Sequence, residues 1–198
     1  MPRTKRLDRR AAVAALLMDR GDDLLVVAGL GASAWDCAAA GDHHQTFPLW
    51  GAMGGAVPMG LGLALARPDK RVLVINGDGE MLMGLGSLTA VGAKQPDNLA
   101  IVILDNERYG ETGMQLTNTG CGTDLAAIAK ASGIPVVATI GSEPCLGDAV
   151  SLARTARGPV LVVIKVDREN HELVLPPRDG PLLKNRFRAA LGLHALPK

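Results

Sequence analysis

Two short segments of the sequence combine oxygen-bearing side chains with glycine, and each follows an apolar run. Residues 77–80 (GDGE) follow RVLVIN, and residues 105–110 (DNERYG) follow AIVIL. If the two runs form parallel strands, both segments lie at the carboxyl edge of one sheet, where open α/β sheets bind ligands. The carboxylate of Asp78 and the amide oxygen of Asn106 would then converge on a hard cation such as Mg²⁺.

The glycines on either side of Asp78 allow backbone N–H groups to approach a phosphate closely. A helix expected to start near Glu80 would direct its positive N-terminus at the same anion. Taken alone, GDG is a common strand-to-helix turn with a purely structural role. The second polar segment, on the next strand of the same pattern, is what favours a binding site.

Short apolar runs that alternate with alanine-rich stretches must position these segments. Strands are predicted over residues 24–28, 71–76, 100–105, 135–140 and 160–166, and helices over 8–20, 33–40, 55–66, 81–93, 124–132 and 143–157. The strands are continuously apolar, which is typical of parallel strands buried on both faces. The alternation predicts a doubly wound α/β fold, with a mostly parallel sheet and helices on both of its faces.

The sequence changes character after the last predicted strand. Residues 1–166 are expected to form one domain, and 167–198 a C-terminal arm that packs on this domain or on a neighbour. The arm contains the turn-rich stretch PPRDGP and a possible short helix over 182–191.

Composition excludes several classes of protein. A net charge of +1 gives no global reason to bind nucleic acid or a membrane surface, and no apolar run approaches the ~20 residues that a membrane span needs. The three cysteines are scattered, which predicts free thiols and a cytoplasmic location. A basic run at the N-terminus is interpreted mainly as a solvated helix start, with anion binding as the alternative; it comprises Arg3, Lys5, Arg6, Arg9 and Arg10.

The GDG segment, followed at this distance by an asparagine-containing turn, resembles the signature of thiamine diphosphate enzymes, specifically their diphosphate-binding domain. The resemblance implies thiamine diphosphate and Mg²⁺ as cofactors. It implies three metal ligands: the side chains of Asp78 and Asn106 and the backbone carbonyl of Arg108, where most members have glycine. The implied cofactor-binding residues are Gly51, Ala52, Met53, Gly77, Asp78, Gly79, Glu80, Asn106, Arg108, Tyr109 and Gly110.

Residues 49–55 (LWGAMGG) precede a helix rich in alanine and glycine. Within the resemblance, the carbonyl of Gly51 binds the amino group of the aminopyrimidine. Met53 is then the apolar residue that wedges the cofactor into its bent shape. The simpler alternative is that Met53 fills the core and the glycines serve a tight turn.

Residues 104–107 (LDNE) and 111–115 (ETGMQ) are similar to a smaller group of these enzymes, the sulfopyruvate and phosphonopyruvate decarboxylases. This resemblance, over about residues 41–134, implies decarboxylation of a 2-oxo acid. A carboligase or lyase of the acetolactate synthase type and a non-catalytic assembly subunit are the alternatives. Glu111 and Met114 depart from the serine and glycine usual there, and an acidic Glu111 facing the pocket would disfavour a doubly anionic substrate.

These enzymes also need a glutamate that contacts the aminopyrimidine and comes from a separate pyrimidine-binding domain. The motifs of this chain belong to the diphosphate half only. A second subunit is therefore expected to supply the glutamate, in a hetero-oligomer of α/β type whose active site lies at the interface.

Four further residues are candidates for a direct catalytic role, alongside Met53. His43 and His44 are expected near the carboxyl edge, where they could shuttle protons or only form an exposed loop. Thr112 stands where some relatives place a catalytic carboxylate, and Glu111 precedes it. Two tail histidines, His171 and His194, are expected on the surface.

Overall fold

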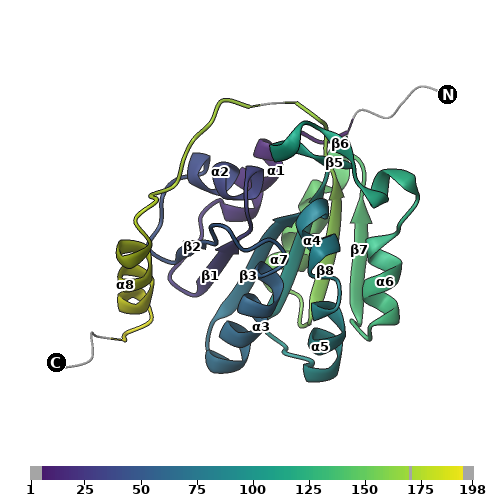
Figure 1. The fold of residues 1–198 in the computed structure, drawn as a ribbon. Coiled ribbons are helices and arrows are strands. Elements are labelled where there is room, and N and C mark those ends of the chain that lie inside the picture. Colours follow the sequence, from purple (N-terminus) through teal and green to yellow (C-terminus); the bar gives the residue numbers. More distant parts are fainter. Residues whose placement is uncertain (1–5, 170, 194–198) are drawn as a thin grey trace.

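The computed structural model describes residues 6–169 and 171–193 and contains one six-stranded sheet (Figure 1). All strand pairs in this sheet are parallel, and the order is β2-β1-β3-β4-β8-β7. The strands are β1 (Leu24–Ala28), β2 (Thr46–Pro48), β3 (Arg71–Gly77), β4 (Leu99–Asp105), β7 (Val136–Ile140) and β8 (Val160–Lys165). The predicted α/β fold with a parallel sheet is confirmed.

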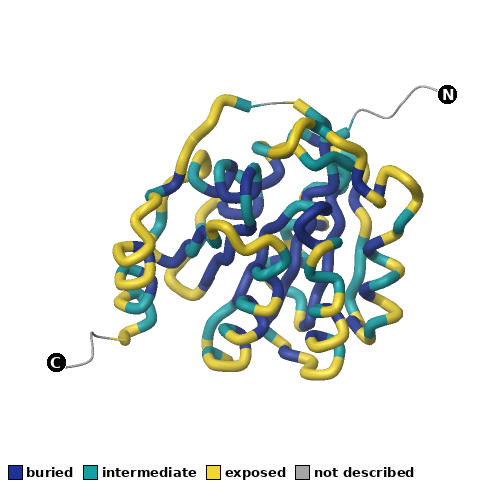
Figure 2. Tube along the Cα trace, viewed as in Figure 1, coloured by how far each residue is buried: buried dark blue, intermediate teal, exposed yellow. Residues whose placement is uncertain are grey.

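Helices cover both faces of the sheet, as Figure 2 shows from the dark, buried strands between partly exposed helices. Three helices pack on one face: α1 (Arg9–Leu17), α2 (Ala32–Ala39) and α7 (Leu146–Thr155). Four pack on the other: α3 (Ala56–Ala66), α4 (Asp78–Met83), α5 (Ser87–Lys94) and α6 (Leu125–Ala131). Two hydrophobic cores result, one on each side of the sheet.

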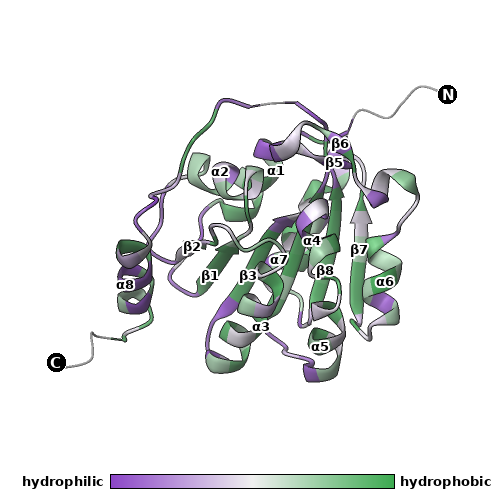
Figure 3. Cartoon of the chain, viewed as in Figure 1, coloured by the Kyte–Doolittle hydropathy of each residue, from purple (hydrophilic) through white to green (hydrophobic). Residues whose placement is uncertain are grey.

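The central strands are apolar except near their ends, because both of their faces are covered (Figure 3). Successive side chains of a strand point to opposite faces. In β3, Leu73 and Ile75 belong to the core beneath α1 and α2, whereas Val72 and Val74 belong to the core beneath α3. Every residue of β4 is buried.

The strand order reverses between β1 and β3, which makes this point the topological switch of the sheet. After β1 the chain enters α2 on one face, and after β3 it enters α4 on the other. The two connections therefore diverge and leave a crevice at the carboxyl edge, which is where doubly wound sheets bind their ligands.

The sequence did not predict strand β2, and this changes the position of two candidate residues. β2 runs parallel to β1, with Thr46 beside Val26 and Pro48 beside Ala28. Residues just before β2 therefore lie at the amino edge of the sheet. His43 and His44 are at this amino edge, so their expected position near the carboxyl edge was wrong.

Two predicted helices are interrupted. The stretch 81–93 is divided into α4 and α5 by Gly84 and Gly86, and α4 already begins at Asp78. The stretch 143–157 consists of the 3₁₀ helix η3 (Glu143–Cys145) followed by α7. Beyond β4 the chain forms a short antiparallel hairpin and two more 3₁₀ helices: β5 (Arg108–Tyr109), η1 (Gly110–Thr112), β6 (Gln115–Leu116) and η2 (Asn118–Cys121).

The arm leaves β8, passes over the carboxyl edge and ends in helix α8 (Gly180–Ala190) beside the edge strand β2 (Figure 1). Phe187 is 5% exposed and packs edge-to-face on Phe47, with 5.6 Å between the ring centroids. Arg186 also forms an ion pair with Asp42. Helix α8 thereby covers the free edge of the sheet and contributes to one of the two cores.

No helix in the described part of the chain is long and apolar enough to cross a membrane. Cys37, Cys121 and Cys145 are all free thiols, as the sequence predicted. Arg3, Lys5 and His194 lie outside the described residues.

Candidate active site

A cavity of about 450 Å³ lies at the carboxyl edge, where the loops after β1, β3 and β4 meet. It brings together most of the residues predicted to bind a cofactor or to act near it. Those on its walls are Met53, Gly77, Asp78, Gly79, Glu80, Asn106, Arg108, Tyr109, Gly110, Glu111 and Thr112. Gly51 and Ala52 do not line it and are exposed beside Met53.

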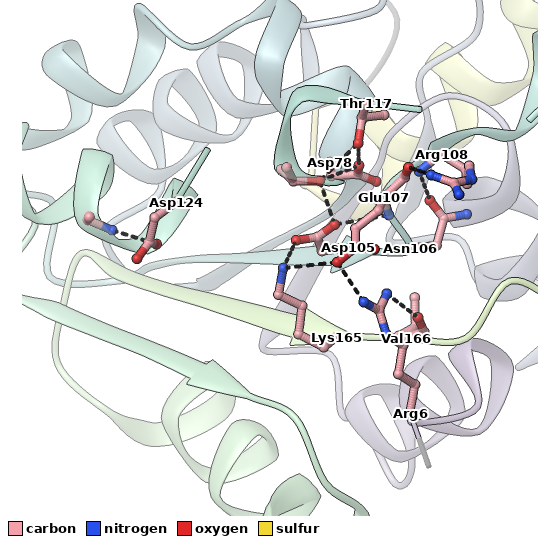
Figure 4. A network of polar contacts seen from close by, with 12 residues as sticks. Arg6, Asp78, Asp105, Asn106, Glu107, Arg108, Thr117, Asp124, Lys165 and Val166 are labelled. Atoms are coloured by element: carbon pink, nitrogen blue, oxygen red, sulfur yellow. Dashed lines mark hydrogen bonds and ion pairs between the residues drawn. The ribbon is translucent and has the colours of Figure 1, made fainter. Parts of the chain in front are cut away.

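Asp78 is a buried carboxylate with no cationic partner among the residues that the structure describes. It is 2% exposed, and its Oδ2 accepts hydrogen bonds from the hydroxyls of Thr117 at 2.6 Å and Thr119 at 3.0 Å (Figure 4). Burial raises the pKa of Asp78 to about 6, and the nearby charge of Asp105 adds to the increase. A buried negative charge without a positive neighbour fits a site for a divalent cation.

The next loop holds Asn106 beside Asp78 through a set of charged contacts. Asp105, at the end of β4, pairs with Lys165 at 2.5 Å, and its Oδ1 lies 2.9 Å from the Thr119 hydroxyl, whose single proton it shares with Asp78. The Oδ1 atom of Asn106 accepts a hydrogen bond from the backbone N–H of Arg108 at 2.9 Å, which fixes the orientation of the amide. The conformation of the turn is therefore set before any ligand binds.

Glu107, and not Arg108, takes the left-handed backbone conformation in this turn, with φ of 64°. Its carboxylate is tied to Arg6 at 2.5 Å and to Arg168 at 2.8 Å, and these hydrogen bonds hold the pKa of Glu107 below its usual value despite some burial. Arg108 lies in β5, where a side chain is tolerated without strain. An arginine at this position is therefore compatible with the loop.

Tyr109 closes one side of the cavity against Gly79. A Cβ atom on Gly79 would lie 2.6 Å from the ring of Tyr109, so only glycine fits there. The absence of a side chain leaves the backbone of the first turn of α4 open to the cavity.

Glu80 joins the β3 loop to two other loops. Its side chain is 3% exposed and accepts a hydrogen bond from the backbone N–H of Leu30, which follows β1, at 2.9 Å. The N–H groups of Ala56 and Gly54 also favour the charged carboxylate, but burial dominates and raises the pKa of Glu80 to about 7. A Cβ atom on Gly29 would collide with this carboxylate.

The loop that carries Met53 rests on the end of α4. A Cβ atom on Gly54, whose φ is 83°, would lie 2.8 Å from the backbone nitrogen of Gly84. Met53 is 38% exposed and lines the cavity. The alternative in which Met53 fills the core is therefore wrong.

The remaining catalytic candidates separate into two groups. Thr112 lies on the cavity wall and donates a hydrogen bond to Gln115, and Glu111 lies against Gly31. His43 and His44 stack on each other outside the cavity, and His44 is 3.6 Å from Asp22, which precedes β1. Nothing in their surroundings supports a role for the two histidines in the cavity.

A further wall, formed by the β1 loop and the N-terminal ends of α1 and α2, was not predicted from the sequence. Leu30, Ala32, Ser33, Trp35 and Arg9 all line the cavity. So does His171, which was expected on the surface and lies 3.4 Å from Asp8. The glycines that flank Leu30, directly after the apolar run of β1, were the available signal. These glycines lie at the switch point of the sheet, and the switch point follows from the position of β2, which was not predicted.

Residues 29–164 match the family model described as the C-terminal TPP binding domain of thiamine pyrophosphate enzymes. The chain belongs to the thiamine pyrophosphate enzymes. It is also 34% identical to the sulfopyruvate decarboxylase subunit beta of Methanocaldococcus jannaschii, over 94% of this chain and 97% of that subunit. The resemblance seen in the motifs is confirmed.

Two further comparisons place this thiamine pyrophosphate domain among its relatives. The chain is 38% identical to the phosphonopyruvate decarboxylase of Streptomyces viridochromogenes, and the match covers 91% of this chain but 45% of that enzyme. A solved structure from Mycobacterium smegmatis, described as a thiamin diphosphate-dependent enzyme, superposes with a TM-score of 0.71 at 24% identity, over 84% of this chain and 33% of that one. The second comparison supports the fold alone.

Proposed function

We propose that this chain is the diphosphate- and Mg²⁺-binding subunit of a decarboxylase that acts on a 2-oxo acid with thiamine diphosphate (thiamine pyrophosphate) as cofactor. A separate subunit would supply the pyrimidine-binding domain and its activating glutamate. The observation that carries the proposal is the buried, cation-free carboxylate of Asp78 beside the fixed amide of Asn106, at the switch point of the sheet. The relative named subunit beta, which this chain matches along 97% of its length, supports a two-subunit enzyme.

The residues that line the cavity divide into four roles. The side chains of Asp78 and Asn106 and the carbonyl of Arg108 would hold Mg²⁺, and the backbone around Gly79 would approach the diphosphate. When bound, thiamine diphosphate supplies the electron sink that allows carbon dioxide to leave a 2-oxo acid. Met53 would give the cofactor an apolar support, and Tyr109 would exclude water beside the diphosphate.

Decarboxylation is better supported than carboligation. Five relatives that match at least four fifths of this chain are sulfopyruvate or phosphonopyruvate decarboxylases, at 34–41% identity. The acetolactate synthase isozyme 1 large subunit of Escherichia coli is 28% identical over 64% of this chain. A non-catalytic role is disfavoured because Asp78 and Asn106 are both present on the wall of the cavity.

Reconstitution with the pyrimidine subunit tests the proposal. The chain would be co-purified from its native host with any bound partner, and release of carbon dioxide would be measured with a panel of 2-oxo acids that includes sulfopyruvate. We expect activity that requires both chains, thiamine diphosphate and Mg²⁺. Full activity of this chain by itself would refute the divided site. If the product is a compound formed by ligation of two carbonyl compounds, and not a free aldehyde, the carboligase is favoured.

A further inference from the structure

The cavity has a second polar wall, built from the N-terminal ends of α1 and α2 and not from the β3 and β4 loops. Arg9 and Ser33 line this wall and are only 8% and 3% exposed. The interpretation of the basic N-terminal run as a solvated helix start is therefore wrong for Arg9. A guanidinium and a hydroxyl that are buried on a cavity wall are held in place by the fold.

Within the described structure, the guanidinium group of Arg9 is held through its Nε atom. Its Nε donates to Oδ2 of Asp36 at 2.5 Å, and the Nε of Arg10 donates to Oδ1 of the same carboxylate at 3.1 Å. Asp36 is completely buried. One carboxylate thus balances two guanidinium groups, and the terminal nitrogens of Arg9 form no hydrogen bond within the described part of the chain.

The first turn of α2 adds backbone donors to the same wall. The helix follows Gly31, whose φ is 73°, and no side chain caps its N-terminus. The N–H groups of Ala32 and Ser33 are among those that an α-helix leaves without an internal partner, and the helix dipole makes this end positive. The Ser33 hydroxyl forms no hydrogen bond among the residues described. Arginine, hydroxyl and N–H groups together make a donor set suited to an oxyanion.

Glu111 already places a carboxylate at this wall. A Cβ atom on Gly31 would lie 2.7 Å from Oε1 of Glu111, so the carboxylate touches the start of α2. Burial raises the pKa of Glu111, and the charge of Arg9 opposes this shift. No hydrogen bond or ion pair joins Glu111 to the donors in the described structure. Glu111 therefore balances the excess positive charge without satisfying the groups that carry it.

We propose that Arg9, Ser33 and the first turn of α2 form an oxyanion site within the cavity, and that Glu111 competes with the incoming oxyanion. The oxyanion comes either from the terminal phosphate of the cofactor or from the acidic distal group of a 2-oxo acid. The inference rests on the proposed function only for this choice of source. Removal of the charge of Glu111 should strengthen oxyanion binding, and removal of the charge of Arg9 should weaken it. If the cluster were purely structural, the two changes would not have opposite effects on affinity.

Two variants of the full-length chain test the site. Inorganic diphosphate with Mg²⁺ is titrated into Glu111→Gln and Arg9→Gln by calorimetry, and the KM for sulfopyruvate is measured in the enzyme assembled with its pyrimidine subunit. We expect Glu111→Gln to strengthen binding about threefold to tenfold and Arg9→Gln to weaken it about tenfold, for the same ligand. A response of the diphosphate affinity assigns the site to the cofactor, and a response of the KM assigns it to the substrate.

Matched controls are available on the surface. Glu143→Gln and Arg157→Gln change the net charge equally at exposed positions away from the cavity, and should alter neither measurement. If Arg9→Gln fails to fold because Asp36 loses a partner, Ser33→Ala should still weaken binding, about twofold to threefold. The proposal is overturned if the two charge variants shift affinity in the same direction, or if neither ligand responds. Diphosphate binding does not require decarboxylation, so failure of the proposed function would leave this measurement intact.

Discussion

At the scale of single residues, the site depends on a charge that the protein buries without neutralising it. Asp105 has Lys165, and Glu107 has Arg6 and Arg168, but Asp78 accepts hydrogen bonds from two hydroxyls and has no cationic partner among the described residues. Asp78 was predicted as a metal ligand because it follows one predicted strand and Asn106 follows the next, in a pattern that resembles thiamine diphosphate enzymes. The sequence could not predict the contrast with Asp105, because Lys165 and Thr119 approach only through the folded sheet.

Replacement of Asp78 by asparagine should separate stability from binding. Because the pKa of Asp78 is raised to about 6, the stabilisation from its neutral form is complete below about pH 4 and is lost as pH rises through about 6. At pH 7.5, without metal, Asp78→Asn should therefore increase the free energy of unfolding, by on the order of 1 kcal/mol. Mg²⁺-dependent binding of thiamine diphosphate should fall about 100-fold.

Thermal unfolding between pH 4 and 8, together with calorimetry of the cofactor, measures both effects of Asp78→Asn. Asp124→Asn is a suitable control, because Asp124 caps α6 on the surface and asparagine caps a helix about as well, so neither stability nor cofactor affinity should change appreciably. Unchanged cofactor affinity in Asp78→Asn would remove this residue from the metal site.

Met53→Ala tests whether the methionine acts on the ligand or on the fold. Met53 is 38% exposed, so truncation should change the free energy of unfolding by less than about 1 kcal/mol. Turnover in the assembled enzyme should fall about tenfold, because the cofactor loses its apolar support. Met81→Ala is the matched control: Met81 is 1% exposed, and truncation should cost about 2–5 kcal/mol in chemical denaturation. Equal loss of stability in both variants would show that Met53 is structural.

At the scale of elements, strands were easier to predict than the connections that hold the site. The parallel strands were visible because burial on both faces demands continuous apolar residues. β2 was not, because it has three residues and ends in proline. Its absence concealed both the switch point and the true position of His43 and His44. The break between α4 and α5 depends on the packing of Gly54 against Gly84, a contact between loops that are distant in sequence.

Gly29→Ala should disturb the site mainly through Glu80, although the added Cβ would also lie 2.9 Å from the Cβ of Asn76. Gly29 does not have a positive φ, so the backbone accepts alanine, but the added Cβ would collide with the Glu80 carboxylate. We expect this carboxylate to leave the N–H of Leu30, loosening the β1 and β3 loops together. The Kd for thiamine diphosphate with Mg²⁺ should rise about tenfold, as measured by calorimetry.

A second change and a control identify the cause of this loss. Shortening the opposing side chain, in Gly29→Ala combined with Glu80→Ala, removes the closest clash but not the 2.9 Å approach to the Cβ of Asn76. Relative to Glu80→Ala, the double variant should therefore lose much less cofactor affinity than Gly29→Ala loses relative to the unmodified chain. Gly62→Ala, at an open position in α3, should raise the stability by about 0.5–1 kcal/mol without altering affinity. If Gly29→Ala binds the cofactor normally, Glu80 does not link the loops.

At the scale of the whole molecule, the chain is built around the six-stranded sheet, whose carboxyl edge is open and whose edge strand β2 is covered. The carboxyl edge is open and holds the cavity, and the arm crosses it before α8 covers strand β2. A boundary after residue 166 was predicted from the change in composition. Phe187 nevertheless belongs to the core beneath α3, so the arm contributes to the stability of the domain it was expected only to contact.

Phe187→Ala tests how far the arm is part of the folding unit. Because Phe187 is 5% exposed and packs on Phe47, its truncation should lower the free energy of unfolding by about 3 kcal/mol in denaturant titrations, in a single transition. Trypsin should also cut the released arm faster at Lys184 and Arg186. Leu182→Ala in the same helix is 51% exposed and should do neither. If faster cleavage occurs with no loss of stability, the arm is an appendage, and the core ends at the boundary that composition predicted.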